Sequence, residues 1–343
     1  MKDAKYLAAY LLPLSAALAL YWQGGWSWAT VLLAFVILPV VEIFTPESEE
    51  NVPAELESSR SNCRVFDLLL YLNVPIVFGL LYWYLQVIGS ASAYAETLGL
   101  TLSMGIIIAA NGINVAHELG HRSAKAEQFL SKLLLLPALY QHFFIEHNRG
   151  HHKNVATDQD PASARLGENV FAFWPRSVVG GWLSAWAIEK ERLVRNGRSP
   201  WSWQNEMLRF TVLQLLWLGA IRWAFGWTGF IAAAAVAVVG FLLLETINYV
   251  EHYGLRRRML PSGRPEPVGP EHSWNSNHEL GRIFLYELTR HSDHHFKATR
   301  KYQILRHMDE SPQLPYGYPT SILLSLAPPV WFAIMHRRIK TDA

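Results

Sequence analysis

The stretch from Thr97 to His121, TLGLTLSMGIIIAANGINVAHELGH, joins a long apolar run to a pair of histidines. Residues 97–116 carry no charged side chain and reach the roughly 20 residues that a helix needs to cross a hydrocarbon core of about 30 Å. His117 and His121 follow, four residues apart, so both imidazoles would face the same side of a continuing helix. This stretch therefore predicts a membrane span that carries two candidate metal ligands at its end.

Five other apolar runs have a similar length and extend this interpretation to the whole chain. Hydrophobic residues make up 51% of the sequence, and a buried helix of a soluble protein could imitate one such run but hardly six. We therefore predict an all-α integral membrane protein that forms a single domain, 1–343. Its six transmembrane helices are expected at 6–22, 27–44, 67–89, 97–116, 209–227 and 229–250, with a helical cap built from 117–208 and 251–343.

Basic residues predict the orientation of these spans. Neither 6–59 nor 65–121 contains Lys or Arg, and Arg222 is the only such residue within 210–255. By the positive-inside rule, both termini and the cap would then lie on the cytoplasmic side. The first run is too long, and lacks a clear cleavage site, for a removable signal peptide.

Nine of the 14 histidines concentrate in four short segments beyond the predicted span ends. Eight fall in three boxes, HELGH at 117–121, HNRGHH at 147–152 and HSDHH at 291–295, and His252 lies in NYVEHYG after the sixth span. Because an even number of spans separates these segments, all nine imidazoles would reach the same side of the membrane. The ends of the fourth and sixth spans could bring them together.

Spacing within the boxes is what a metal site would require, although it does not divide the imidazoles between two ions. His147 and His151 repeat the four-residue spacing of the first box, so a regular helix would place them on one face. His152 would then point about 100° further round the helix. Nine nitrogen ligands would suffice for two ions with four or five each, leaving a coordination position open for a small ligand.

The imidazoles alone do not select the metal, because they bind iron, copper, zinc and nickel alike. A site that opens towards the bilayer has apolar molecules close at hand. Attack by activated oxygen on an unactivated C–H bond requires a redox-active ion, which excludes zinc. The sequence therefore points to iron, with copper as the alternative.

Two other function classes compete with this interpretation. HELGH also matches the H-E-x-x-H pattern of zinc proteases, in which Glu118 would be the general base, but seven clustered histidines would stay unexplained. A metal transporter would place ionisable groups near the middle of the spans, whereas the boxes lie beyond their ends. We therefore expect Glu118 to support a ligand or to lie on the helix surface.

The boxes and several longer stretches resemble the integral-membrane non-heme diiron alkane monooxygenases of the membrane desaturase and hydroxylase superfamily. The resemblance runs from about Phe35 to the C-terminal region. Three boxes alone are shared with membrane fatty-acid desaturases and hydroxylases. The alkane hydroxylases are favoured by the box spacings, by NYVEHYG, and by ATDQDPASARLGE (156–168), PEHSWNSNH (270–278) and RKYQILRHMDESPQLPYGYP (300–319).

This resemblance implies terminal hydroxylation of an n-alkane by dioxygen to a 1-alkanol and water, within a bacterial inner membrane. The cap would hold a diiron site, and the two electrons would come from rubredoxin and its reductase. Cys63 is the only cysteine and cannot supply four thiolates, so a separate rubredoxin is expected. Membrane lipid surrounds the spans, and no nucleic acid is implied. The implied iron ligands are His117, His121, His147, His151, His152, His252, His291, His294 and His295.

Nearby carboxylates are candidates for orienting these imidazoles through their second ring nitrogen. They are Glu118, Glu146, Asp158, Asp160, Glu251 and Asp293, although each also suits a loop charge or a helix cap. The remaining histidines are expected to be structural: His142, His272, His278, His307 and His336. A fatty-acyl desaturase or ω-hydroxylase stays open as an alternative function. The basic segment 253–343 could meet anionic lipid or an acidic partner protein.

Overall fold

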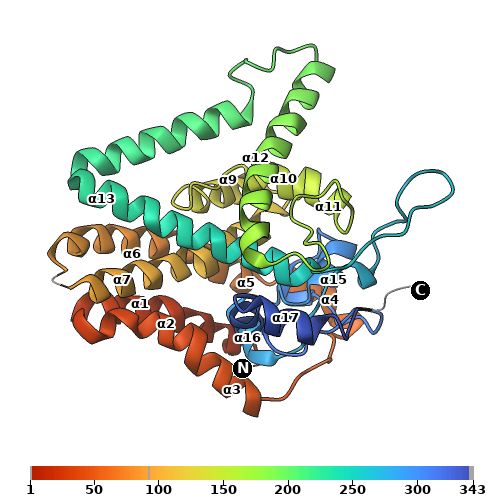
Figure 1. Ribbon diagram of the computed structural model, residues 1–343, viewed down its shortest axis with the longest axis horizontal. Helices are drawn as coiled ribbons and strands as arrows, with labels where there is room; N and C mark the ends of the chain where they lie inside the picture. The colour runs from red at the N-terminus through yellow and green to blue at the C-terminus, as the bar shows by residue number, and fades with distance from the viewer. Residues whose placement is uncertain (1, 92, 340–343) are drawn as a thin grey trace.

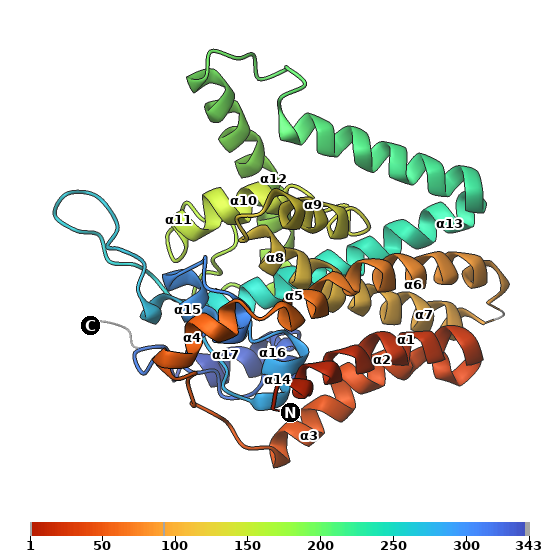
Figure 2. The same cartoon turned by 180° about the vertical axis from the view of Figure 1, so that it is seen from behind.

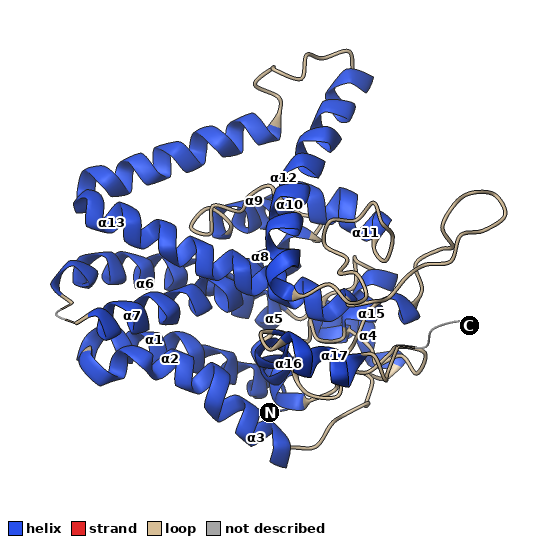
Figure 3. Cartoon of the chain, in the orientation of Figure 1, coloured by secondary structure: helices blue, strands red, loops and turns tan. Residues whose placement is uncertain are grey.

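The computed structural model describes residues 2–91 and 93–339, and regular structure in this part of the chain is helical (Figure 1, Figure 3). The described residues contain isolated bridges but no strand, which confirms the all-α prediction. The α-helices are α1 (Leu11–Trp22), α2 (Ala29–Leu32), α3 (Leu38–Phe44), α4 (Ala54–Ser61), α5 (Arg64–Tyr71), α6 (Asn73–Val87), α7 (Tyr94–Ile107), α8 (Asn114–Gly120), α9 (Lys125–Leu134), α10 (Phe143–Glu146), α11 (His152–Asn154), α12 (Val170–Arg195), α13 (Glu206–His252), α14 (Glu279–Phe284), α15 (His291–Phe296), α16 (Tyr318–Ser325) and α17 (Pro328–Met335).

Short 3₁₀ and π segments join several of these helices. The 3₁₀ segments are η1 (Lys2–Tyr10), η2 (Gly24–Trp28), η4 (Ile88–Ser90), η7 (Pro270–His272) and η8 (Tyr302–Ile304). The π segments are η3 (Leu33–Ile37), η5 (Ile108–Ile113) and η6 (His147–His151). Single π turns inside α-helices occur frequently at functional sites. Here, η5 directly precedes the first histidine box and η6 forms most of the second.

Five described helical segments are long and apolar enough to cross a membrane, as expected of a multi-pass membrane protein. The first four contain the first four predicted spans and begin three residues before them, and the third and fourth also end after them. The segments are Asp3–Trp22, Gly24–Phe44, Arg64–Ser90, Tyr94–Gly120 and Glu206–His252. Exposed apolar side chains on their outer faces, including Leu14, Val36 and Leu215, suit contact with lipid rather than water.

The fifth segment, α13, contains both the fifth and the sixth predicted span. Its 47 residues are divided at Gly226, whose φ of 68° and ψ of −167° are open essentially only to glycine. The chain therefore reverses direction at this residue, and the two arms of α13 form a V (Figure 1). The predicted count of six crossings depends on both arms crossing, and it stays a prediction.

The first four spans and the second arm of α13 lie side by side, while the first arm of α13 stands apart, and the histidine boxes gather at one end of this bundle (Figure 1, Figure 2). Both views show α12 running across the direction of the spans, away from the main bundle. Because α12 extends outwards instead of covering the bundle, the predicted helical cap stays a prediction. Near the C-terminus, α16 and α17 are eight residues each and are separated around Pro328. Each is too short to cross a bilayer, in agreement with the absence of a seventh predicted span.

Candidate metal centre

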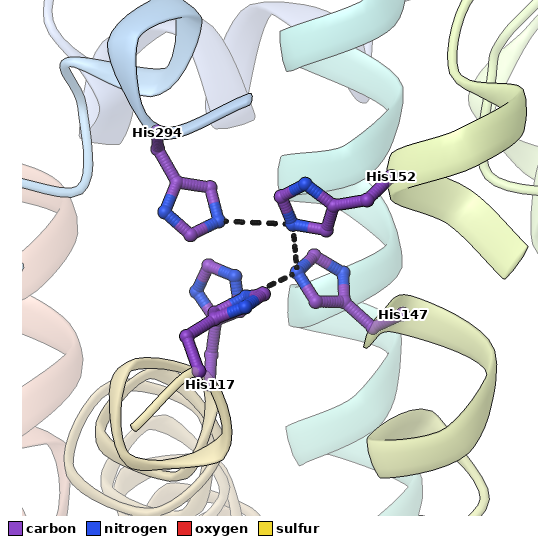
Figure 4. A group of neighbouring side chains, drawn as sticks. His117, His147, His152 and His294 are labelled. Atoms are coloured by element: carbon purple, nitrogen blue, oxygen red, sulfur yellow. Dashed lines mark hydrogen bonds between the residues drawn. The ribbon is translucent and has the colours of Figure 1, made fainter. Parts of the chain in front are cut away.

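The side chains of all nine predicted histidines converge in two groups. Within each group, one nitrogen from every imidazole lies within 4.8 Å of the nitrogens of the others. The first group contains His117, His121, His147, His152 and His294, and the second contains His151, His252, His291 and His295. Figure 4 shows how His117 from α8, His147 and His152 from the continuous stretch of η6 and α11, and His294 from α15 approach one another. Each group has the form of a site for one metal ion.

Distances between the ring nitrogens of the first group test whether an ion fits. The Nε2 atom of His147 lies 3.1 Å from that of His121 and 3.0 Å from that of His152. His152 Nε2 is 3.2 Å from His294 Nε2. Two ligands that each sit about 2.0–2.1 Å from one ion are about 3.0–3.4 Å apart. The nitrogens are therefore spaced as neighbouring ligands of a single ion would be.

The second group has the same spacing. His295 Nε2 is 2.9 Å from His291 Nε2 and 3.2 Å from His151 Nε2. His291 Nε2 is in turn 3.2 Å from His252 Nε2. The two groups are neighbours, because the His152 and His295 rings stack across them with centroids 4.4 Å apart. Their donor set fits a pair of adjacent ions.

The division of the second box between the groups corrects a prediction. His147 and His151 were expected to share one face, yet His147 joins the first group with His152, and His151 joins the second. The cause is η6, in which the His152 amide donates to the His147 carbonyl, five residues back. A π turn aligns residues five apart rather than four. The i,i+4 rule for a regular α-helix therefore fails at this position.

Burial keeps most of these imidazoles neutral, which is the form that binds metals. Burial, together with neighbouring imidazoles, lowers the pKa of His147, His294 and His295 well below its usual value. Burial and the nearby His151 lower the pKa of His152 to about 3. Removing so many ring nitrogens from water is costly unless they find partners. Metal coordination would supply those partners.

Asp160 contacts His151 on the side of the ring that faces away from the other ligands. Its Oδ2 lies 2.9 Å from His151 Nδ1, while Ser163 Oγ and the Ala162 amide also donate to the carboxylate. Burial opposes a charge on His151, but the Asp160 carboxylate prevails and raises the pKa of that imidazole. Such a carboxylate fixes the tautomer and orientation of a metal-binding histidine.

Glu251 is the second candidate carboxylate that lies beside a histidine. Its Oε2 is 3.2 Å from His291 Nε2, and its Oε1 accepts a hydrogen bond of 2.8 Å from Tyr318. Because it meets the nitrogen that faces the other ligands, Glu251 borders the second group directly. It is therefore placed to contact an ion there.

The other four candidate carboxylates make different contacts. Glu118 pairs with Arg122, and Asp293 pairs with Arg300. Asp158 is exposed and pairs with Arg256, at 3.7 Å. Glu146 is buried beside His147 and lines a small cavity. The sequence therefore identified the carboxylates near the site but could not separate Asp160 and Glu251 from the rest.

The five remaining histidines lie outside both groups. Hydrogen bonds hold His272 to Gly269, His278 to Ser276, His307 to Asn277 and His336 to Tyr253. His142 is buried against the Tyr140 ring, with ring centroids 4.2 Å apart. Their placement agrees with a structural role.

An apolar cavity of about 80 Å³ lies between the spans and reaches the helices that carry the histidines. Asn114, one turn before His117, lines it, and so does Tyr318, which is bonded to Glu251. The other lining residues include Leu12, Phe35, Ile106, Leu243, Ile247, Phe284 and Ile322. This cavity suits a hydrocarbon chain, because apolar contact is the main interaction available to such a ligand.

Residues 92–324 match the family model described as Fatty acid desaturase. The matched region includes all nine clustered histidines. The chain belongs to the fatty acid desaturase family.

Within the fatty acid desaturase family, curated relatives cover nearly the full chain. It is 39% identical to alkane 1-monooxygenase 2 of Pseudomonas aeruginosa, over 99% of this chain and 93% of that protein. It is 38% identical to alkane 1-monooxygenase 1 of Alcanivorax borkumensis, over 97% and 84%. The xylene/toluene monooxygenase hydroxylase component of Pseudomonas putida is 28% identical over 96% and 87%. These findings confirm the resemblance to the alkane monooxygenases.

Two polar residues near this desaturase-family site escaped the sequence analysis. Tyr318 lies in the stretch 300–319 that supports the resemblance, but no local signal in this stretch identifies its contact with Glu251. Glu245 is a carboxylate inside an otherwise apolar run, GFIAAAAVAVVGFLLLETINYV. An ionisable residue within a span is a functional candidate by default, and this signal could have found it.

Replacing Asp160 with asparagine is expected to weaken metal retention about 10–100-fold, because the His151 imidazole loses its anionic partner. Asparagine still offers an oxygen to His151 Nδ1, so the loss should be partial. The measurement is the metal content after dialysis against graded chelator concentrations. Asp158→Asn is the matched control, since Asp158 lies two residues away but is exposed. Equal metal retention in both variants would contradict this role for Asp160.

Proposed function

We propose that this chain hydroxylates the terminal carbon of n-alkanes to give 1-alkanols, as the names of its alkane 1-monooxygenase relatives suggest. The observation that carries the proposal is the convergence of nine histidines in two adjacent groups beside an apolar cavity. We propose one membrane domain, 1–343, with two iron ions held by these nine histidines. Iron would supply the redox chemistry that activates dioxygen, which zinc lacks.

The residues of this chain would perform three tasks in that reaction. The buried imidazoles would hold the two ions, and Asp160 would fix the ring of His151 through Nδ1. The apolar cavity would hold the alkane by dispersion and exclude water, since an alkane offers no polar group to bind. Asn114 and Tyr318 mark the part of the cavity nearest to the histidines, where the terminal methyl group would lie.

The electron donor and the orientation form a further part of the proposal. We propose that a separate rubredoxin, with its reductase, supplies two electrons, because Cys63 alone cannot build a rubredoxin centre. The distribution of Lys and Arg supports a bacterial inner-membrane protein with both termini and the histidines on the cytoplasmic side.

Purified protein, rubredoxin, rubredoxin reductase and NADH should convert medium-chain n-alkanes into 1-alkanols, with about two irons bound per chain. Gas chromatography of the products and elemental analysis of the protein check both expectations. One zinc per chain, or no alcohol across a range of chain lengths, would reject the proposal.

A desaturase or ω-hydroxylase acting on fatty-acyl chains is the second candidate, and the description of the matching family model favours it. Labelled acyl substrates would then give an alkene or a hydroxy acid, while alkanes would give no product. The identity to several alkane 1-monooxygenases supports the alkane reaction over this alternative.

A further inference from the structure

A second, smaller cavity lies beside both histidine groups. It shares α13 with the apolar cavity, but its other lining residues come from α10, α12 and adjoining segments. Its volume is about 10 Å³, close to the space that one water molecule requires. His147 of the first group and His151 of the second both line it. Its remaining lining includes Tyr140, Glu146, Ser177 and Glu245. This cavity therefore connects the candidate metal centre to two buried carboxyl groups.

Glu245 carries a buried carboxyl group within α13, and the residue as a whole is only 3% exposed. Its Oε1 accepts a hydrogen bond of 2.6 Å from Tyr140 Oη, and its Oε2 accepts one of 2.5 Å from Ser177 Oγ. Asn248 Nδ2 lies 3.4 Å from the same Oε2. Ionisable residues inside membrane spans are costly, and they often form proton pathways.

Tyr140 links this carboxyl group to the outer surface of the protein. Together with His142, it lines both the small cavity and a groove of about 300 Å³ between α12 and α13. Thr211 and Gln214 of the groove belong to the first turns of α13, which starts at Glu206. Glu206 is paired with Lys132 and Arg149, so this end of α13 carries a cluster of charged side chains.

The proposed reaction needs such a pathway, because it consumes protons as well as electrons. In RH + O₂ + 2e⁻ + 2H⁺ → ROH + H₂O, the C–H and O–O bonds break while C–O and O–H bonds form. Rubredoxin, the electron donor proposed above, supplies the two electrons. The apolar cavity is lined mainly by hydrocarbon side chains, although Glu42 and Tyr318, which bonds to Glu251, also border it.

We propose that Tyr140 and Glu245 deliver these protons from the groove between α12 and α13 to a water molecule in the small cavity. Tyr140 passes a proton to Glu245, and Glu245 passes one on to the cavity beside His147 and His151. The inference rests on the proposed hydroxylase function. It assigns to Glu245 a role in proton delivery rather than in metal binding, since no histidine of either group contacts its carboxyl oxygens in the described chain.

The experiment uses the iron-loaded, full-length enzyme with Glu245→Gln and Tyr140→Phe. Each variant should lower kcat at least about tenfold, with little change in KM for the alkane and an increased solvent isotope effect in D₂O. Iron content and melting temperature should stay at their wild-type values. Glu96→Gln is the matched control, because Glu96 is also a buried carboxyl group in a span. It accepts a hydrogen bond from the Gly24 amide, which is distant in sequence from the residues that line the small cavity. This control should leave all of these values unchanged.

Infrared difference spectra, recorded on reduction with dithionite, provide a second readout that needs neither alkane nor rubredoxin. A carboxyl band that responds to reduction in the wild type should be absent from Glu245→Gln and present in Glu96→Gln. If the wild type forms no alcohol, the proposed function fails, while this band still tests Glu245 by itself. Wild-type kcat and isotope effect in Glu245→Gln would overturn the inference. A loss of iron with an unchanged isotope effect would do the same, because it would indicate a structural role.

Discussion

Replacing His294 or His291 with alanine should abolish alkane hydroxylation and lower the iron content of the purified protein. His294 belongs to the first histidine group and His291 to the second, and both are almost completely buried. Losing a group that only orients a ligand costs about 10–100-fold in metal affinity or activity, so losing a ligand should exceed 100-fold. Elemental analysis and product formation measure the two effects in the same sample.

His336→Ala is the control for these variants, because His336 is exposed and bonds to Tyr253 outside both groups. It should retain full iron and activity. The division into two groups also predicts that each single substitution should affect mainly one of the two irons. A variant at His294 or His291 that keeps two irons and normal turnover would show that the imidazoles do not form the metal centre.

Among substitutions of buried residues in the cap, Arg122→Ala should cause the largest loss of stability. Arg122 is buried, and its guanidinium lies 2.8 Å from Glu118 and 3.1 Å from Asp67. Glu118 Oε1 also accepts a hydrogen bond from the Tyr302 amide, so the pair joins the fourth span to the C-terminal segment. Removing one partner of a buried ion pair typically costs about 3–5 kcal/mol. A much lower melting temperature in detergent would report this loss.

The exposed pair Arg195–Glu191 provides the matched control, because it has the same i,i+4 spacing on a helix. Arg195→Ala should leave the melting temperature nearly unchanged, as is usual for exposed ion pairs. Equal melting temperatures for the two arginine variants would contradict the structural role of Arg122.

The same ion pair argues against the zinc-protease interpretation of HELGH. A general base needs a carboxylate that is free to take a proton from water, whereas Glu118 is engaged by Arg122 and the Tyr302 amide. Glu118→Gln should therefore lower stability and leave iron binding in place. In a protease of this type, the same change would instead abolish hydrolysis.

Much of the fold could be predicted because membrane insertion depends on local composition. Runs such as 67–89 and 97–116 are apolar over a length that matches a bilayer, and they are helical in the structure. The set of clustered histidines could also be predicted. Four-residue spacing places side chains on one face of a helix, and an even number of intervening spans brings the boxes to one side of the membrane. Gly226 was harder to interpret, since an isolated glycine between two apolar runs does not specify whether the chain turns within one helix.

The sequence by itself determined the chemistry of this protein: apolar lengths that suit a bilayer, nine imidazoles at its boundary and membership of the desaturase family. Only the tertiary structure decided how those imidazoles divide, because the π turn at His147–His151 rotates His151 away from His147. It also decided that Asp160 and Glu251, but neither Glu118 nor Asp293, meet a histidine. The physical reason is that composition and spacing act along the chain. The direction of each side chain depends on backbone hydrogen bonds and on partners that are distant in sequence.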